Sequence, residues 1–320
     1  MSVLVIGSTG IVGPHVVRAL RARGVCTRVF TRDPQRALRL FPDGVDIRCC
    51  TPHLQSSLLD AADGLDAAFL LTPHDPRSAD IQLEMIRVLR RTGVRIVKVS
   101  GTTAAVTPDG PEATRRHWEV EQVLTHSGQP FVILQPCTFM QFLIDRIVLP
   151  ILRDTGKIID PLGPAGINYV DVRDIGECGA EALTDPRWAG QTLALTGPRA
   201  VTFDEIAEQV GARIGRTVET VQLNPWEVRR QFQKRGMAWW EADHFRELFG
   251  LFRQGLAESV SPDVDRLIGR QPIGLDDYLR THPAFESADT IAAWRDAEAW
   301  PTDGGAIHSV GREHGRGQMA

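Results

Sequence analysis

The sequence predicts an α/β fold, in which a doubly wound parallel sheet is followed by a smaller, mostly helical C-terminal lobe. Three observations support this prediction. Short β-branched runs alternate with helical patterns at the spacing that crossover connections require. A glycine-rich turn joins the first such run to the first helical pattern. The alternation ends near residue 155, where Gly- and Pro-rich turns begin.

The elements follow one another in a regular order. Residues 3–6 read Val-Leu-Val-Ile, a short β-branched strand, and Val16, Val17 and Leu20 then recur at helical spacing. Further apolar runs predict strands at 27–31, 45–49, 67–71, 96–100 and 131–134. Helical periodicity between them predicts helices at 57–62, 81–92 and 114–126. The N-terminal half therefore predicts helices on both faces of one sheet.

The second half is less regular. Thr202 followed by Glu205 forms a capping box, which predicts a helix ending near Gly215. Residues 226–286 are predicted to be mostly helical. We expect a first domain at 1–155, with sheet-completing segments near 168–200, and a substrate lobe at 156–286 that is interleaved with it. Residues 287–320 form a predicted tail, partly flexible.

Composition excludes several classes of protein. The 320 residues carry a net charge of −4 and a pI near 6.2, so no basic field attracts nucleic acid. Polar residues interrupt the apolar stretch 131–152, which predicts no membrane span. Five cysteines without a C-x-x-C pair favour a cytoplasmic protein. Frequent Arg, Ala and Gly with few lysines suggest a bacterial source.

The strongest motif is Gly7-x-x-Gly10-x-x-Gly13, placed between a strand and a helix. The first glycine allows a tight turn, the second lets a pyrophosphate approach the backbone, and the third lets the helix pack against the sheet. This pattern predicts a Rossmann-type dinucleotide site; a merely structural turn is the alternative. The predicted cofactor-binding residues of the turn are Gly7, Thr9, Gly10, Ile11, Val12 and Gly13.

The second strand ends at Thr31, and Arg32 follows it. This end faces the adenosine ribose in a dinucleotide fold, where an arginine favours a 2′-phosphate. The sequence therefore predicts NADP(H) in preference to NAD(H). The alternative is a solvated Arg32 that pairs with Asp33.

The predicted nicotinamide side lies after the fourth and fifth strands. Thr72 and Pro73 follow one strand and Ser100 ends the other, where a hydroxyl can hold a substrate oxygen or cap a loop. His117, on the next helix, is a candidate general acid near neutral pH. The alternative for His117 is an ordinary surface histidine.

Some chemistries are absent from the sequence. The two tyrosines, Tyr169 and Tyr278, are followed four residues later by Arg173 and His282, so no Tyr-x-x-x-Lys pair exists. The nine histidines show no metal-ligand spacing, and we expect no metal. There is no Gly-x-Ser-x-Gly elbow either.

Several segments together resemble the NmrA-like group of the atypical short-chain dehydrogenase/reductase superfamily. The resemblance covers about residues 1–285 and rests on Gly-Ser-Thr-Gly-Ile-Val-Gly (7–13), Thr-Arg-Asp-Pro (31–34), Val-Lys-Val-Ser (97–100), His-Trp-x-x-Glu (117–121), Val-Asp-Val-Arg-Asp-Ile (170–175) and Leu-Thr-Gly-Pro (195–198). The pattern departs from the family at Cys50-Thr51, Gln135-Pro136 and Phe142, where Gly-Asp, Arg-Pro and Asn are usual.

The resemblance implies an NAD(P)H-dependent reductase of a conjugated or aromatic small molecule, such as a quinone or an enone. It also implies that His117 stands where several such reductases carry a catalytic lysine. The candidate catalytic residues are His117 and Ser100. An apolar substrate wall is predicted from Phe139, Met140, Phe142, Trp239 and Trp240, with core packing as the alternative for each.

Two other functions remain open on the sequence. One is a non-catalytic NADP(H) sensor that binds a protein partner; the other is a cofactor-bound enzyme of non-redox chemistry, such as cyclisation or isomerisation. We expect a monomer or homodimer in every case.

Overall fold

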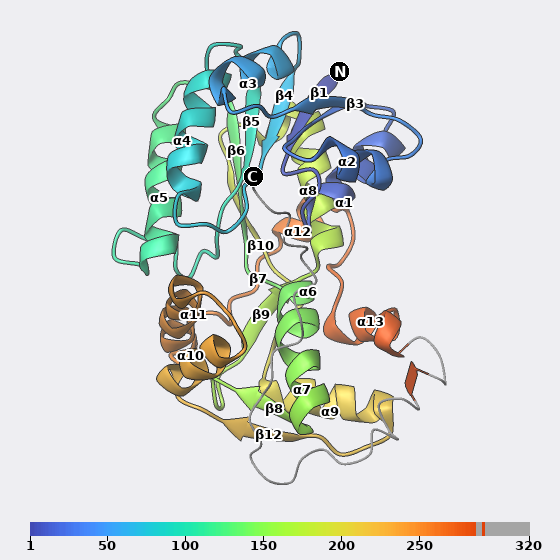
Figure 1. The fold of residues 1–320 in the computed structure, drawn as a ribbon, viewed down its shortest axis with the longest axis vertical. Helices are drawn as coiled ribbons and strands as arrows, with labels where there is room; N and C mark the ends of the chain where they lie inside the picture. The colour runs from blue at the N-terminus through green and yellow to red at the C-terminus, as the bar shows by residue number, and fades with distance from the viewer. Residues whose placement is uncertain (286–289, 292–320) are drawn as a thin grey trace, which may run out of the picture.

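The computed structural model describes residues 1–285 and 290–291. The predicted tail at 287–320 lies outside the described residues, apart from 290–291. Two bodies of the chain, one around a large parallel sheet and one beneath it, make up the fold (Figure 1). In the described part of the chain, no helix has both the length and the apolar character needed to cross a membrane.

The large sheet has seven strands, all parallel, in the order β10-β6-β5-β4-β1-β2-β3. The order reverses between β1 and β4, and ligands of doubly wound sheets bind at the carboxyl ends of the strands beside such a reversal. The strands are β1 (Ser2–Ile6), β2 (Cys26–Thr31), β3 (Asp46–Cys49), β4 (Ala67–Leu70), β5 (Arg95–Val99), β6 (Phe131–Pro136) and β10 (Thr192–Leu195).

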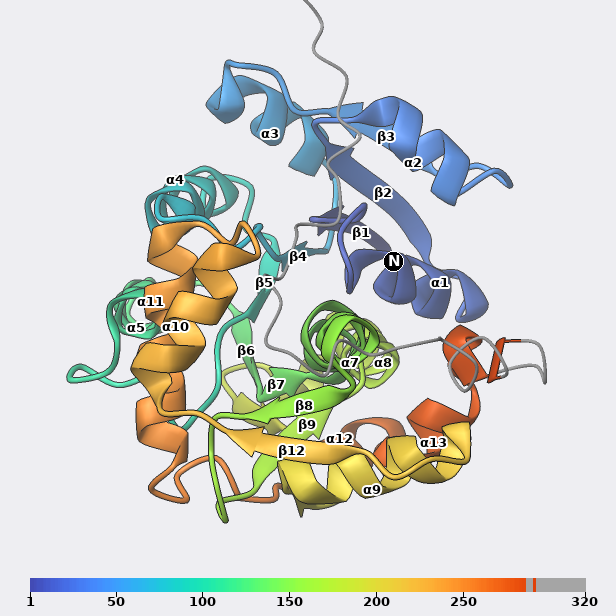
Figure 2. The same ribbon diagram turned by 60° about the horizontal axis from the view of Figure 1, so that its bottom comes forward.

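Helices cover both faces of this sheet (Figure 2). Successive strand side chains point to opposite faces, so Val3 and Val5 pack in one core while Leu4 and Ile6 pack in the other. The first core includes residues of α1 (Gly13–Ala22), α2 (Pro34–Leu40) and α8 (Val172–Thr184). The second includes residues of α3 (Leu54–Ala62), α4 (Ser78–Leu89) and α5 (Glu112–Thr125). The predicted doubly wound α/β sheet is confirmed.

The lower body has a core of its own. The residues of 140–152 that pack in this core are Met140, Leu143, Ile144, Ile147, Val148, Leu149, Ile151 and Leu152. The predicted boundary at 155 stays a prediction. Its helical elements are α6 (Met140–Leu143), the π-helix η1 (Ile144–Val148), α7 (Leu149–Thr155), α9 (Phe203–Ile214), α10 (Pro225–Lys234), α11 (Trp239–Phe252), α13 (Leu275–Arg280) and η3 (Pro283–Phe285). Its strands form the small sheets β11-β9-β7 and β12-β8. These strands are β7 (Thr138–Phe139), β8 (Lys157–Asp160), β9 (Ile167–Val170), β11 (Ala200–Val201) and β12 (Glu219–Gln222).

Two short helices, η2 (Pro186–Trp188) and α12 (Asp263–Ile268), complete the described elements. The helix α2 was not among the predicted elements. Pro34 opens it, and the Asp33 side chain caps it by accepting from the Arg36 amide at 2.9 Å. Asp33 followed by Pro34 is therefore a signal for a helix start. The sequence analysis predicted only the strands before and after it.

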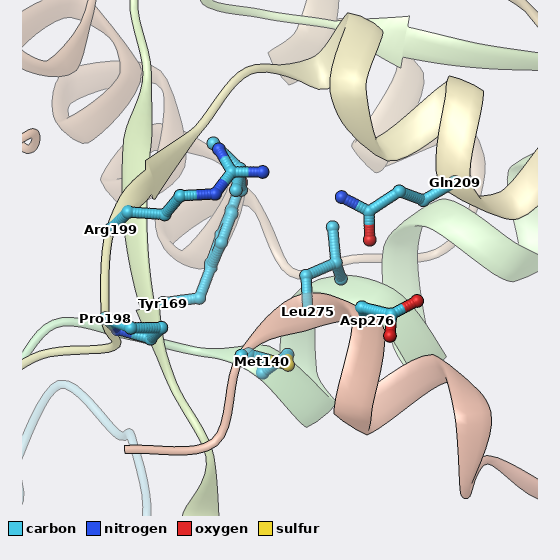
Figure 3. A pocket seen from close by; sticks show the side chains of 9 residues that line it. Met140, Tyr169, Pro198, Arg199, Gln209, Leu275 and Asp276 are labelled. Carbon is cyan, nitrogen blue, oxygen red and sulfur yellow. The ribbon is translucent and has the colours of Figure 1, made fainter. Parts of the chain in front are cut away.

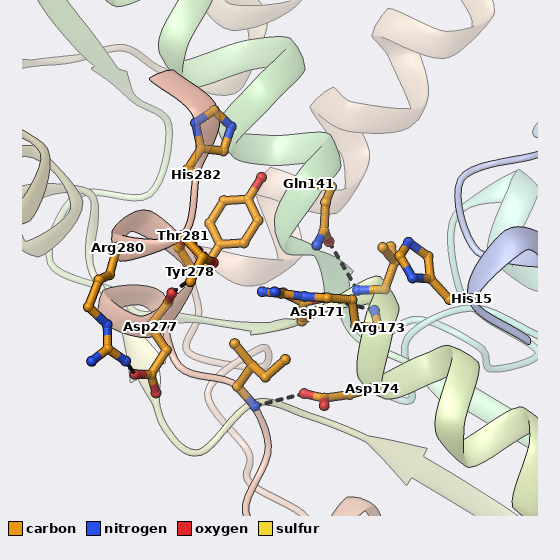
Figure 4. A network of polar contacts seen from close by, with 12 residues as sticks. His15, Gln141, Asp171, Arg173, Asp174, Asp277, Tyr278, Arg280, Thr281 and His282 are labelled. Atoms are coloured by element: carbon orange, nitrogen blue, oxygen red, sulfur yellow. Dashed lines mark hydrogen bonds and ion pairs between the residues drawn. The ribbon is translucent and has the colours of Figure 1, made fainter. Parts of the chain in front are cut away.

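Polar contacts fix the start of α8 between the two bodies (Figure 4). The Gln141 side chain accepts from the Val172 amide at 3.0 Å, which joins α6 to α8. Asp174 accepts from the Ile273 amide at 2.7 Å, which joins α8 to the segment before α13. Because both contacts are made by the first turn of α8, the lower body is held at a defined position under the sheet.

The predicted capping box at Thr202 is confirmed: its hydroxyl accepts from the Glu205 amide at 3.1 Å, and the Glu205 carboxylate accepts from the Thr202 amide at 2.8 Å. Thr202→Ala should lower the free energy of unfolding by about 1 kcal/mol, because the Glu205 amide loses the hydroxyl that accepts its hydrogen bond. Urea denaturation measures this loss. Thr202→Ser keeps the hydroxyl and should retain most of the stability; equal losses in both variants would contradict the cap.

Candidate active site

The glycine turn after β1 leaves no room for a side chain at Gly7 or at Gly13. Gly7 has a φ of 80°, and a Cβ on it would lie 2.3 Å from the Leu71 carbonyl oxygen. A Cβ on Gly13 would lie 2.3 Å from the Gly7 carbonyl oxygen. Non-bonded carbon and oxygen atoms do not approach one another more closely than about 3 Å, so this turn needs glycine at both positions.

The same turn presents unused donors at an open surface. In the described part of the chain, no acceptor is recorded for the amides of Ile11 and of Val12, the N-cap of α1. Ile11 is 42% exposed, and the first turn of α1 carries no acidic residue. A helix N-terminus with free amides suits an anionic group, so the residues present fit a dinucleotide pyrophosphate.

Arg32 lies exposed directly after β2. The alternative of a pair with Asp33 is not what forms, because the Asp33 carboxylate caps α2. Among residues 1–285, no ion pair is recorded for Arg32. The guanidinium is therefore available to an anion near the carboxyl end of β2.

The carboxyl ends of β4 and β5 bring the other predicted residues near one another. Thr72 accepts from the Gln82 side chain at 2.7 Å, which fixes the residue preceding Pro73. Ser100 is 7% exposed, and its hydroxyl has no partner among the described residues. A Cβ on the adjacent Gly101 would lie 3.6 Å from His117 Cδ2. The loop after β5 and the imidazole of His117 therefore border the same space.

His117 is in contact with a buried lysine. Lys98, in the middle of β5, is 0% exposed, and its Nζ lies 3.3 Å from His117 Nδ1. Burial lowers the pKa of Lys98 to about 7, against the opposing effect of Glu121. Burial and the charge of Lys98 lower the pKa of His117 well below its usual value. His117 is therefore neutral at neutral pH, so the predicted general acid would donate from a neutral imidazole.

Two further histidines approach from other elements. His74 follows β4, and its ring centroid lies 4.7 Å from that of His244 on α11 and 5.0 Å from that of Trp240. Burial, with a smaller contribution from His74, lowers the pKa of His244 to about 3. Both histidines act on the pKa of His117, so the three imidazoles share one region. The contact between His74 and His244 joins α11 to the loop that follows the carboxyl end of β4.

Only part of the predicted substrate wall faces this region. Trp240 contacts His74, and Phe142 stacks on Phe245, which in turn contacts His244. Trp239 is 68% exposed, because neighbouring helical residues point about 100° apart and Trp240 faces inward.

The remaining two wall residues contribute to packing. Met140 is 2% exposed in the lower core, and Phe139 packs against the core around α1 and α8. Core packing, the alternative reading, therefore describes these two residues. Residue type alone does not distinguish them from Phe142 and Trp240.

The sequence analysis did not select Lys98, His74 and His244, which the structure places near His117. A lysine within the β-branched run Val-Lys-Val was the available signal for Lys98, since a charged residue in a central buried strand needs a partner. Nothing local marks His74 and His244, which lie 170 positions apart and meet only through the packing of α11.

Neither tyrosine has a recorded hydrogen bond or ring contact with His117 among the described residues. Tyr169 is 2% exposed on β9 and lines a cavity of about 140 Å³ near α9 and α13 (Figure 3). The Tyr278 hydroxyl donates to Asp145 in the π-helix, and the same carboxylate contacts His282. Within the described residues, no group of His, Cys, Asp or Glu has a geometry that holds a metal ion.

Comparison with known proteins gives consistent matches. The pattern of the NmrA-like family matches residues 1–279. Over 285 residues the chain is 30% identical to the NAD(P)H azoreductase of Xenophilus azovorans, covering 88% of this chain and 98% of that protein.

Solved structures share the fold. The NADPH-dependent quinone oxidoreductase QOR2 of Escherichia coli, complexed with NADPH, superposes with a TM-score of 0.79 at 20% identity, covering 87% of this chain and 98% of that one. The triphenylmethane reductase of Citrobacter sp., complexed with NADP(H), gives 0.75 at 22% identity, covering 88% and 99%.

Proposed function

The chain belongs to the NmrA-like family, and from this premise we propose that it is an NAD(P)H-dependent reductase that prefers NADPH. The acceptor is a conjugated or aromatic small molecule, such as an azo compound, a quinone or an enone. His117 donates a proton or hydrogen bond to the acceptor, and Phe142 and Trp240 contribute an apolar wall.

One observation carries this proposal. The imidazole of His117 lies beside the loop after β5, at the carboxyl edge of a sheet whose first turn suits a pyrophosphate. Ligands in such sheets lie along this edge. A nitrogen donor, a buried serine hydroxyl and aromatic rings from α11 therefore surround the place where a nicotinamide and a flat acceptor would meet.

Bound NAD(P)H would supply the hydride. The amides of Ile11 and Val12 would hold the pyrophosphate, and Arg32 the 2′-phosphate. Ser100 would orient the carboxamide or the acceptor. His117 would donate to the oxygen or nitrogen on which negative charge develops, and the aromatic wall would keep bulk water from the acceptor.

Oxidation of NADPH, followed by its absorbance, tests the function with a panel of an azo dye, a quinone, an enone and a cationic triarylmethane dye. The proposal expects oxidation with at least one acceptor. NADPH binding, seen by tryptophan fluorescence, without oxidation by any acceptor would contradict it. A strong preference between NADPH and NADP⁺ in that case would favour the sensor.

Arg32→Asp should weaken NADPH binding about tenfold to a hundredfold, because a charge-assisted hydrogen bond worth about 1.5–3 kcal/mol is replaced by repulsion. Binding of NADH, which has no 2′-phosphate, should change little. Isothermal titration with both cofactors measures the two Kd values. Arg36→Asp, an exposed neighbour on α2, is the control; equal effects on NADPH in both variants would contradict a specific role of Arg32.

A further inference from the structure

Lys98 is a charged residue in a fully buried position, where the charge costs free energy unless a partner stabilises it. It lies in a central strand with no exposed surface, and among the described residues no carboxylate lies within ion-pair distance of its Nζ. The nearest acidic residue on α5, Glu121, is occupied by the Gln135 side chain, which donates to both its oxygens at 3.0 and 3.1 Å. A buried ammonium without an ion pair is costly to keep.

The contacts that Lys98 does make point to His117. Its Nζ lies 3.3 Å from His117 Nδ1 and 3.4 Å from the Val99 carbonyl oxygen. A lysine ammonium only donates, so Nδ1 must accept. The single ring proton of a neutral His117 is then on Nε2, the nitrogen that is left for a ligand.

This tautomer alone does not make His117 an acid. A neutral imidazole that gives up its Nε2 proton becomes an anion unless Nδ1 gains a proton at the same time. The only donor recorded at Nδ1 in the described chain is Lys98. If the Lys98 ammonium gives a proton to Nδ1 as Nε2 loses its own, the imidazole stays neutral; Lys98 then acts as a proton store for His117.

We propose that Lys98 is the positioning residue that holds the proton for His117 and fixes its Nε2–H tautomer. This inference rests on the proposed reductase function. When the acceptor takes the hydride and its electron pair, negative charge develops on an oxygen or nitrogen. The His117 Nε2–H bond breaks and a new O–H or N–H bond forms on the acceptor. At the same time a Lys98 Nζ–H bond breaks and an Nδ1–H bond forms.

The step leaves Lys98 as a neutral amine and His117 as a neutral imidazole. Because Lys98 has no contact with solvent, its proton returns through His117 after the product has left. The groups around this pair are Glu121 on α5, His74 after β4 and His244 on α11. With the pKa of Lys98 near 7, the proton store is filled below about pH 7 and empties above it.

Two kinds of acceptor separate this role from a structural one. Reduction of an azo bond needs a hydride and a proton. Reduction of a cationic triarylmethane dye needs the hydride alone, because the central carbon cation becomes neutral when it gains the hydride. Loss of the proton store should therefore slow the first reaction more than the second.

The experiment compares the full chain with Lys98→Met, which keeps the length of the side chain, and with Lys234→Met, an exposed control on α10. In Lys98→Met the ratio of azo to cationic-dye reduction rates should fall at least about tenfold, and the decline above pH 7 should disappear. Lys234→Met should have the rate ratio of the wild type and the same decline above pH 7. An unchanged ratio in a folded Lys98→Met would overturn the proposal.

Nitrogen-15 NMR of the histidine side chains gives a readout that needs no turnover. In the unliganded wild type, His117 should carry its proton on Nε2, and in Lys98→Met its pKa should rise because a neighbouring positive charge is removed. A proton on Nδ1 in the wild type would overturn the proposal. Absence of NADPH oxidation with all four acceptors would overturn the proposed function, while the tautomer would still decide whether Lys98 orients His117.

Discussion

His117→Phe should lower the rate of azo or enone reduction by about 10²–10⁴-fold, the usual contribution of a positioned proton donor. The phenyl ring keeps the approximate size and planarity of the imidazole but has no nitrogen to donate. Lys98 then loses its partner at 3.3 Å and has no route to the acceptor. Steady-state kinetics with NADPH and an azo dye measure the change in kcat.

The control for this variant is His126→Phe. His126 is an exposed residue at the C-terminal end of the same helix, so it reports on a change of ring type without a change at the site. The affinity for NADPH should be similar in both variants, because neither residue lies in the glycine turn. A folded His117→Phe that turns over as fast as the wild type would remove His117 from the mechanism.

Gly13→Ala should abolish tight cofactor binding and destabilise the fold. The added Cβ would lie 2.3 Å from the Gly7 carbonyl oxygen and 2.5 Å from Ser8 Cα, and both are backbone atoms that no rotamer change can move. Overpacking of this kind costs about 1–3 kcal/mol. The turn must also shift its amides away from the pyrophosphate, which should raise the Kd for NADPH at least about tenfold.

Gly250→Ala on α11 is the matched control. A Cβ there meets no atom within 4 Å, and alanine favours a helix more than glycine does. Its free energy of unfolding should be equal to or above that of the wild type, with unchanged NADPH binding. Urea denaturation and isothermal titration measure both quantities. Normal NADPH affinity in Gly13→Ala would mean that the turn after β1 does not hold the cofactor.

Much of the fold was predictable because it is encoded locally. The β-branched runs, the glycine turn and the capping box at Thr202 each determine backbone conformation within a few residues. Their order then favours one topology, since right-handed crossovers leave few ways to build a parallel sheet. The strands and helices around β1, β4 and β5 lie close to the predicted ranges for this reason.

The same locality explains the predicted site residues that the structure brings together. Ser100 follows β5, and His117 lies on the helix after it, so neighbouring crossovers bring both to one edge of the sheet. The glycine turn lies at the same edge because β1 is parallel to β4 and β5. The sequence alone therefore determined the glycine turn and the placing of Ser100 and His117 at one edge of the sheet.

The tertiary structure decided the rest. Which of Trp239 and Trp240 faces inward depends on how α11 packs, not on residue type, and the meeting of His74 with His244 depends on the same packing. The neutral state of His117 follows from its burial beside Lys98. Contacts between distant segments set these properties, and although the run Val-Lys-Val indicated a buried lysine, no local pattern indicated which side chains would meet it.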